Sequence, residues 1–160
     1  MLRLDHTHFD RELRPPLGSM LVRKGLLTKE QLDEALAERA QTGELLGQAL
    51  LRRGWIFEDE LARVLAEQHE LEFLNLRSVG VDRRLLSLIP ADAGLRLRAV
   101  PVRHVDGDVL TAVADPNDRD GMAELAQLVA QRARSLRLVV AEPSAIAEIW
   151  QRFTRGAALA

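Results

Sequence analysis

A pattern of seven residues occurs twice between positions 17 and 68, and the two copies are separated by a constant offset of 29 positions. The first copy comprises Leu17, Gly18, Leu21, Gly25, Leu32, Leu36 and Arg39. The second copy comprises Leu46, Gly47, Leu50, Gly54, Leu61, Leu65 and Gln68. Because each copy includes two glycines, the match indicates a duplicated structural unit rather than chance similarity in a leucine-rich chain. A duplicated unit favours a ligand or partner that itself has two similar halves.

Each unit is predicted to form a short helix, a tight turn and a second helix. The first and third residues of each copy are leucines four positions apart, which share one face of a helix. Gly25 and Gly54 then stand where a helix C-cap is expected, and each follows two basic residues that suit the negative end of a helix dipole. The last three positions of each copy fall at i, i+4 and i+7 of the second helix.

The second helices of the two units are expected to begin differently. In the first copy, Thr28 and Gln31 form the capping-box pattern that starts a helix. In the second copy, Phe57 stands at the position of Thr28 and has no side-chain acceptor for such a cap. The helix after Phe57 must therefore begin without a side-chain N-cap.

After Gln68 the helical period gives way to short apolar runs separated by turn residues, which indicates a second subdomain. Asp106-Gly107 is a two-residue hairpin signal. Pro90 should end the helix expected just before Pro90 itself, and Ser144 is a candidate N-cap for the last helix. We expect strands at residues 71–76, 99–105, 108–114 and 136–141, and helices at residues 82–89, from the 115–118 loop to about Arg132, and at residues 144–153.

The predicted fold class is therefore α+β: a tandem helix-turn-helix repeat subdomain followed by a small α/β sandwich with a β-hairpin. We assign residues 1–13 to a tail, 14–70 to the repeats, 71–156 to the α/β subdomain and 157–160 to a second tail.

Composition narrows the class of function. With 47% apolar and 29% charged residues the chain resembles an ordinary soluble globular protein. A formal net charge of −2 lacks the basic surplus typical of proteins that bind polymeric nucleic acid. The chain has no cysteine, which excludes disulfides and thiolate chemistry and fits a cytoplasmic protein. No apolar run is long enough for a membrane helix, so we expect membrane contact only through a partner.

Enzymatic and metal chemistry find little support in the sequence. No glycine-rich loop with the Gly-x4-Gly-Lys-Ser/Thr spacing of nucleoside triphosphatases is present. A calcium loop aligned on Gly121 would place Pro116 and Gln127 where acidic ligands are required. His6 and His8 lie in the predicted tail, where no preorganised metal site is expected. We therefore predict a protein that is not an enzyme and that needs no metal or cofactor.

The repeat itself remains as the candidate binding feature. Gly18 and Gly47 lie near the starts of short helices, where backbone N–H groups favour a phosphate and the missing side chain permits close approach. The neighbouring leucines could cover the flat face of a base, so that each unit would take half of a ligand with two phosphates and two bases. The alternative is that the leucines form the core of a helical bundle and the glycines are its caps.

The tandem Leu-Gly-x2-Leu-x3-Gly-x6-Leu-x3-Leu pattern resembles the N-terminal domain of type II secretion and type IV pilus assembly ATPases, the MshEN type. Later segments are similar to the same family: Ile89-Pro90, residues 98–102 and residues 112–118. The resemblance covers roughly residues 14–154. It implies that all fourteen repeat positions bind cyclic di-GMP. This chain departs from the family pattern in having Pro16 and Leu45 where a basic residue commonly precedes Leu-Gly, and Arg39 where the family has glutamine.

Because of these departures, Arg11, Arg14 or Arg39 is a candidate to supply the missing positive charge to the nucleotide. The resemblance implies a regulatory domain that couples cyclic di-GMP to a type II secretion or type IV pilus motor, and that contacts an ATPase or an inner-membrane platform protein from the cytoplasmic side. The alternative function is a protein–protein docking adaptor whose nucleotide site has degenerated. Either an excised domain or a free-standing module would fit this sequence.

Overall fold

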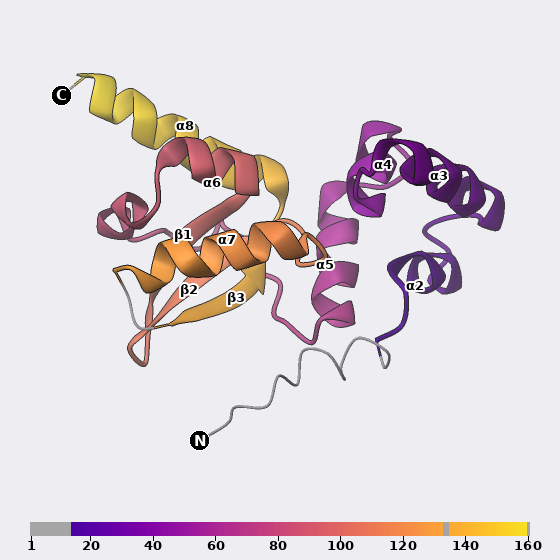
Figure 1. Cartoon of the computed structure of the whole chain (residues 1–160), viewed down its shortest axis with the longest axis horizontal. Coiled ribbons are helices and arrows are strands. Elements are labelled where there is room, and N and C mark those ends of the chain that lie inside the picture. Colours follow the sequence, from indigo (N-terminus) through magenta and orange to yellow (C-terminus); the bar gives the residue numbers. More distant parts are fainter. Residues whose placement is uncertain (1–13, 133–134, 160) are drawn as a thin grey trace.

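The computed structural model describes residues 14–132 and 135–159. The predicted tail at residues 1–13, with Arg11 and both of its histidines, lies outside the described residues. The α+β class is confirmed: helices flank one small sheet of three strands, and Figure 1 shows the repeat helices beside the sheet-containing half. In residues 14–132 and 135–159, no helix has both the length and the apolar character needed to cross a membrane.

The duplicated sequence forms four helices in a short–long–short–long order. The short helices are α2 (Leu17–Arg23) and α4 (Leu46–Arg52), and the long ones are α3 (Lys29–Thr42) and α5 (Glu58–Gln68). Gly25 and Gly54 follow the C-caps with φ of 73° and 70°, a conformation that glycine adopts without steric cost. In each turn the residue after the glycine donates its N–H to the carbonyl oxygen five positions earlier: Leu26 donates to Leu21, and Trp55 donates to Leu50.

The long helices begin as differently as their sequences predict. Thr28 and Gln31 form a complete capping box at the start of α3. Phe57 has no side-chain cap, and only Glu60 reaches back to its backbone N–H, at 3.2 Å. Three acidic residues in the first turn of α5 complement the positive end of its dipole.

The two units exchange contacts. Arg53 at the end of α4 pairs with Glu38 of α3, with 2.5 Å between nitrogen and oxygen, while Lys24 at the end of α2 pairs with Glu67 of α5 at 2.6 Å. Lys24 and Arg53 occupy the same repeat position, as do Glu38 and Glu67. Each short helix therefore packs across the long helix of the other unit, and the repeats are related by an approximate twofold axis. Lys24, Arg52 and Arg53, which were predicted to compensate helix ends, also join the two units.

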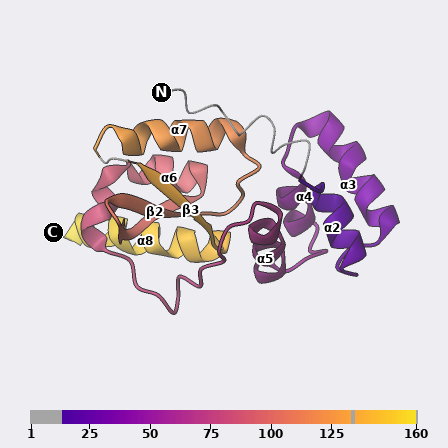
Figure 2. The same ribbon diagram turned by 90° about the horizontal axis from the view of Figure 1, so that it is seen from below.

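The second half contains the predicted hairpin and a parallel strand. Strands β1 (Ala99–Val105) and β2 (Asp108–Val113) are antiparallel and joined at Asp106-Gly107, while β3 (Leu136–Val140) lies parallel to β2. Helix α7 (Arg119–Ala130) connects β2 to β3 as a crossover requires. Figure 2 shows α7 on one side of the strands and α8 (Pro143–Leu159) on the other. A 3-10 helix, η1 (Arg83–Leu88), and helix α6 (Ala91–Leu97) precede the sheet.

Four sequence predictions need correction here. The strand expected at residues 71–76 is only one bridge, between Phe73 and Val140. Pro90 does stop the 3-10 helix, but it is also the N-cap of α6, which the sequence reading missed. Helix α8 begins at Pro143, so Ser144 is not its N-cap; proline suits a first helical position because it has no N–H to leave unpaired. The helix continues to Leu159, so residues 157–159 are not a tail.

Two apolar clusters form the core. One joins the buried faces of the four repeat helices and includes Val140 of β3, and the other lies between the sheet and helices α6, α7 and α8. Trp150 of α8 is fully buried in the second cluster and donates its indole N–H to the carbonyl of Ala99 at 2.8 Å. Gly94 of α6 allows this packing, because a Cβ there would lie 2.3 Å from the Trp150 ring.

We predict that Gly94→Ala lowers the free energy of unfolding by about 1–3 kcal/mol, as expected when an atom is forced into a filled core. Urea unfolding followed by tryptophan fluorescence measures the loss. The control is Gly80→Ala, since a Cβ on Gly80 meets no atom within 4 Å and its φ is not positive. Equal stabilities of the two variants would show that α6 does not depend on close contact with Trp150.

Candidate functional site

One pocket lies where the two sequence repeats meet. Its lining includes Pro16, Leu17 and Gly18 from the start of α2 and Leu45, Leu46 and Gly47 from the equivalent start of α4. Leu32, Leu36 and Arg39 of α3 form one wall, and Gln68 at the end of α5 forms part of the other. The cavity volume is about 500 Å³, within the range of small-molecule sites. We call it the inter-repeat pocket.

Eight of the fourteen predicted ligand positions line this pocket. They are Leu17, Gly18, Leu32, Leu36, Arg39, Leu46, Gly47 and Gln68. The other six have different places. Leu21, Leu50 and Leu65 are at most 1% exposed in the core of the repeats, Leu61 is 4% exposed beneath Gly47, and Gly25 and Gly54 form the exposed turns.

The structural role that the sequence suggested for the glycines is present in the fold. At Gly18 the missing side chain admits a protein group, because a Cβ there would lie 2.4 Å from Cδ1 of Leu32. At Gly47 the equivalent leucine, Leu61, would lie 3.1 Å from a Cβ. The glycines let the long helix of each unit pack directly on the backbone of its short helix. Their first physical role is thus to set the pocket's shape.

The second subdomain completes the pocket with residues that the sequence analysis did not select. Asp115 and Asn117 come from the loop between β2 and α7, Arg119 is the first residue of α7, and all three line the pocket. A Cβ on Gly47 would lie 3.1 Å from Oδ2 of Asp115, which shows how closely this loop approaches α4. The sequence predicts residues 115–118 only as a loop that precedes a helix. Its position in the pocket depends on long-range packing.

A chain of hydrogen bonds holds this loop against the repeats. The Gln68 amide nitrogen donates to the carbonyl oxygen of Pro15 at 3.1 Å, and its amide oxygen accepts from the Asn117 amide at 3.1 Å. His69 Nε2 contacts the amide oxygen of Asn117 at 3.0 Å, and its Nδ1 contacts Arg14 at 2.9 Å. Arg14, predicted as an additional ligand residue, thus lies on His69 beside the pocket rather than in its lining.

Two ionisable groups in this region, Asp115 and His69, have pKa values shifted from their ordinary ones. Burial raises the pKa of the Asp115 carboxyl to about 6, against the opposing effect of the Asn117 backbone N–H that it accepts at 2.9 Å. Burial also lowers the pKa of His69, and the neighbouring Arg14 lowers it further. A carboxyl group kept in a pocket despite this desolvation is suited to accept hydrogen bonds from a ligand.

A metal site would need a cluster of side chains that could bind the ion. Within residues 14–132 and 135–159, no group of three or more histidine, aspartate or glutamate side chains could hold a metal ion. His69 is engaged at both ring nitrogens, by Arg14 and Asn117. The pocket lining combines apolar walls with arginines, a carboxyl group and amides.

Comparison with known proteins assigns the chain to a family. Residues 69–159, more than half of the chain, match the MshEN domain family model, and the chain belongs to that family. The type IV pilus assembly ATPase PilB of Thermus thermophilus is 36% identical over 137 residues, which cover 85% of this chain and 15% of PilB. PilB of Myxococcus xanthus is 28% identical over 137 residues, covering 86% of this chain and 24% of that protein. The chain thus spans less than a quarter of these curated relatives.

Solved structures share the fold of both halves. A structure of MshE with cdg (cyclic di-GMP) has a TM-score of 0.73 and 28% identity, covering 88% of this chain and 99% of that one. The N-terminal domain of XpsE has a TM-score of 0.69 at 22% identity, covering 88% and 94%. The likeness to XpsE shows the fold alone. The likeness to MshE extends over the repeats, which the matched family region does not include.

The burial of Asp115 predicts a specific pH dependence of stability. Its pKa of about 6 in the folded chain exceeds the unfolded value of 3.8, so the folded state holds the proton more tightly. Stability should therefore fall as pH rises from about 4 to 6, by up to about 3 kcal/mol from this group at about 1.36 kcal/mol per pKa unit. Asp115→Asn removes that loss, so the variant should be more stable than the parent at pH 7.5 and similar at pH 4.

Urea unfolding of both proteins at pH 4, 6 and 7.5 measures the difference, in which contributions of other titrating groups cancel. Asp33→Asn, an exposed replacement of the same kind on α3, controls for the loss of a carboxylate. Parallel stability curves for the parent and Asp115→Asn would contradict the assignment.

Proposed function

We propose that this chain binds cyclic di-GMP in the inter-repeat pocket and passes its ligand state to a pilus assembly or secretion ATPase. One observation carries the proposal: equivalent residues of two sequence repeats, Leu17-Gly18 and Leu46-Gly47, line a single cavity. Cyclic di-GMP is a ring of two guanosines joined by two phosphodiesters, so its own halves are equivalent. A pocket formed around an approximate twofold axis suits such a ligand. The similarity to MshE, solved with cdg, supports the same reading.

The walls supply the contacts that a guanine nucleotide needs. Leu32 and Leu36 form an apolar surface for a base, and Leu36 is 41% exposed, so it still offers apolar area that a bound ligand can cover. Arg39 lies one helical turn further along α3 and can donate two parallel hydrogen bonds to guanine or phosphate oxygens. Arg39 therefore offsets the absence of a basic residue at Pro16 and Leu45.

The second subdomain contributes the acceptor. Asp115 lines the same pocket, and an ionised carboxylate there accepts the N–H groups on the Watson–Crick edge of guanine. Hydrogen bonds to the charged form favour ionisation and offset the burial that raises the pKa of Asp115. Arg119, the first residue of α7, supplies a second cation for the phosphates. One ligand would thus contact both repeats and the α/β half at once.

A regulatory role follows from this arrangement. The pocket contains no group positioned for nucleophilic or metal-assisted chemistry, so the proposed ligand is bound and released unchanged. A ligand that joins the repeats to the β2–α7 loop favours one relative arrangement of the two halves. In the longer PilB relatives this domain accounts for less than a quarter of the protein, which leaves the remainder as the recipient of the signal.

The test is calorimetric titration of the purified chain with cyclic di-GMP. We expect saturable binding of one nucleotide, and an increase in melting temperature that grows with ligand concentration. Arg39→Ala should weaken binding at least tenfold, since a charge-assisted hydrogen-bond pair contributes roughly 1.5–3 kcal/mol. Arg23→Ala, at an exposed position on α2 outside the pocket, should change the affinity less than twofold.

A control titration with the mononucleotide 5′-GMP separates recognition of the cyclic dinucleotide from recognition of a single guanine nucleotide. The mononucleotide should bind far more weakly, because it can occupy only one half of the pocket. Absence of heat and of any thermal shift with cyclic di-GMP would refute the nucleotide proposal. That result would favour the second function suggested by the sequence, a docking adaptor whose repeats retain only their structural role.

A further inference from the structure

A groove separate from the inter-repeat pocket runs along one face of α8. Its lining on α8 recurs at spacings of three and four residues over three turns: Ala145, Glu148, Ile149, Arg152, Phe153 and Gly156. The opposite wall is the segment from Leu76 to Leu86, which includes the start of η1. The cavity volume is about 730 Å³, and none of its lining residues lines the inter-repeat pocket. We call it the α8 groove.

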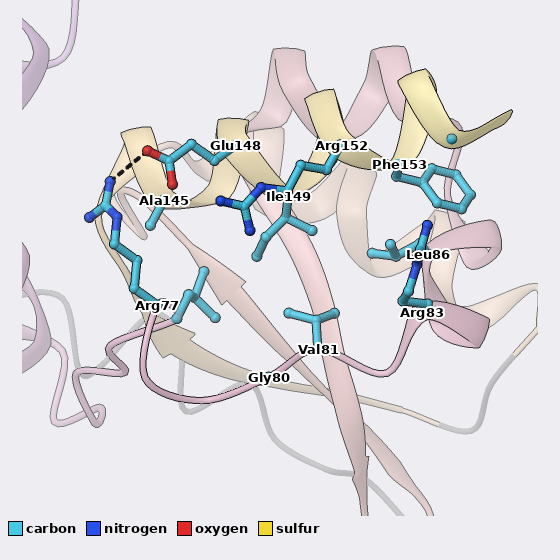
Figure 3. A pocket seen from close by; sticks show the side chains of 12 residues that line it. Arg77, Gly80, Val81, Arg83, Leu86, Ala145, Glu148, Ile149, Arg152 and Phe153 are labelled. Atoms are coloured by element: carbon cyan, nitrogen blue, oxygen red, sulfur yellow. Dashed lines mark hydrogen bonds and ion pairs between the residues drawn. The ribbon is translucent and has the colours of Figure 1, made fainter. Parts of the chain in front are cut away.

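The floor of the groove is apolar and its edges are basic. Val81, Ile149 and Phe153 are half-buried, so each still offers apolar surface to a bound group. Figure 3 shows Arg152 and Ile149 pointing from α8 toward the loop that carries Val81, and Arg83 rising from the other wall beside Phe153. The groove therefore has cations on both walls above an apolar base.

The charges in the groove are not balanced within the described part of the chain. The Arg77 guanidinium forms ion pairs with Glu148 and Glu142, with nitrogen–oxygen distances of 3.0 Å and 3.3 Å. Both of these carboxylates therefore already have a cationic partner. Among residues 14–132 and 135–159, neither Arg83 nor Arg152 forms an ion pair with a carboxylate. In this described part of the chain, Arg83 and Arg152 lie on opposite walls and outside any ion pair within 4.0 Å, and Glu148, already paired with Arg77, attracts Arg152 only at longer range. The positive charge that remains above the apolar floor is complementary to an occupant with apolar and acidic groups.

We propose that the α8 groove binds an extended, acidic and apolar peptide segment of a protein partner. The three lined turns of α8 span about 16 Å at 1.5 Å per residue, the length of about five residues in an extended chain. In such a segment, apolar side chains contact Ile149 and Phe153 while carboxylates pair with Arg83 and Arg152. Partial enclosure by the two walls strengthens these ion pairs relative to fully exposed ones.

The first experiment selects the occupant without assuming its sequence. A phage library of random heptapeptides is panned on the whole chain and counter-selected on the Arg83→Glu/Arg152→Glu variant, whose fold is checked by circular dichroism. We expect the recovered peptides to combine two or more acidic residues with apolar ones. A library that yields no peptide preferring the parent, or peptides without acidic enrichment, overturns the proposal. An Arg83→Gln/Arg152→Gln variant serves if charge reversal prevents folding.

The second experiment measures the recovered peptide by fluorescence anisotropy. Arg152→Glu should weaken binding at least tenfold, and raising the salt concentration should weaken binding to the parent. Arg155→Glu, on α8 but outside the groove, should change the affinity less than twofold. Equal losses in both variants would show that the peptide senses only net charge and would overturn the proposal.

Two other occupants are distinguished by parallel measurements. Vesicles of phosphatidylglycerol that bind the parent but not the double variant would assign the arginines to lipid headgroups. A concentration-dependent dimer in sedimentation that the double variant abolishes would assign the groove to a second copy of this chain. Either result overturns the peptide assignment, and neither depends on whether cyclic di-GMP binds in the other pocket.

Discussion

The arrangement of the repeats depends on a contact between a leucine and the backbone of a glycine, made once in each unit. Leu32 packs on Gly18 and Leu61 packs on Gly47, in each case across fourteen positions of sequence. A Cβ would lie 2.4 Å from the Leu32 methyl group at Gly18, which a side chain does not allow, and 3.1 Å from the Leu61 methyl group at Gly47, where the leucine would have to shift slightly. This contact fixes the approach of the short and long helices, and the reciprocal ion pairs then join the two units. The starts of both short helices consequently border the same cavity.

The twofold relation of the repeats does not extend to their surroundings. On the first unit Leu36 is 41% exposed, while its equivalent Leu65 is 1% exposed because α5 packs between the repeats and the sheet. The β2–α7 loop covers the second unit, where Asn117 bonds to Gln68. A symmetric ligand would therefore meet an open apolar wall at one half and a polar, partly buried wall at the other. This asymmetry makes occupancy of the pocket a constraint on how the two halves of the chain sit together.

Features that depend on residues close together in the sequence could be predicted from it, and features that depend on contacts between distant residues could not. The repeat, its glycine turns, the Thr28 capping box and the Asp106-Gly107 hairpin depend on residues within a few positions of one another, and all are present as predicted. The place of Asp115 in the pocket was missed because it arises from the approach of its loop to Gly47, far away in sequence, and from the bond between Asn117 and Gln68. Ser144 is not an N-cap because α8 begins one residue earlier, at Pro143, and its hydroxyl instead donates to Glu58 and accepts from Arg77, both distant in sequence.

Helix α5 ends in the inter-repeat pocket and begins beside Ser144, which contacts the wall of the α8 groove, so it is the physical route between the two sites. Its last residue, Gln68, lines the inter-repeat pocket, and its first, Glu58, accepts a hydrogen bond from Ser144. Ser144 in turn bonds to Arg77, which lies in the wall of the α8 groove. Because a helix of eleven residues moves largely as a unit, a shift at Gln68 would be felt at Glu58. Thermodynamic linkage then requires that any effect of the nucleotide on peptide affinity be equalled by the effect of the peptide on nucleotide affinity. Two ligands that bind independently would instead mean that α5 holds the same position in every liganded state.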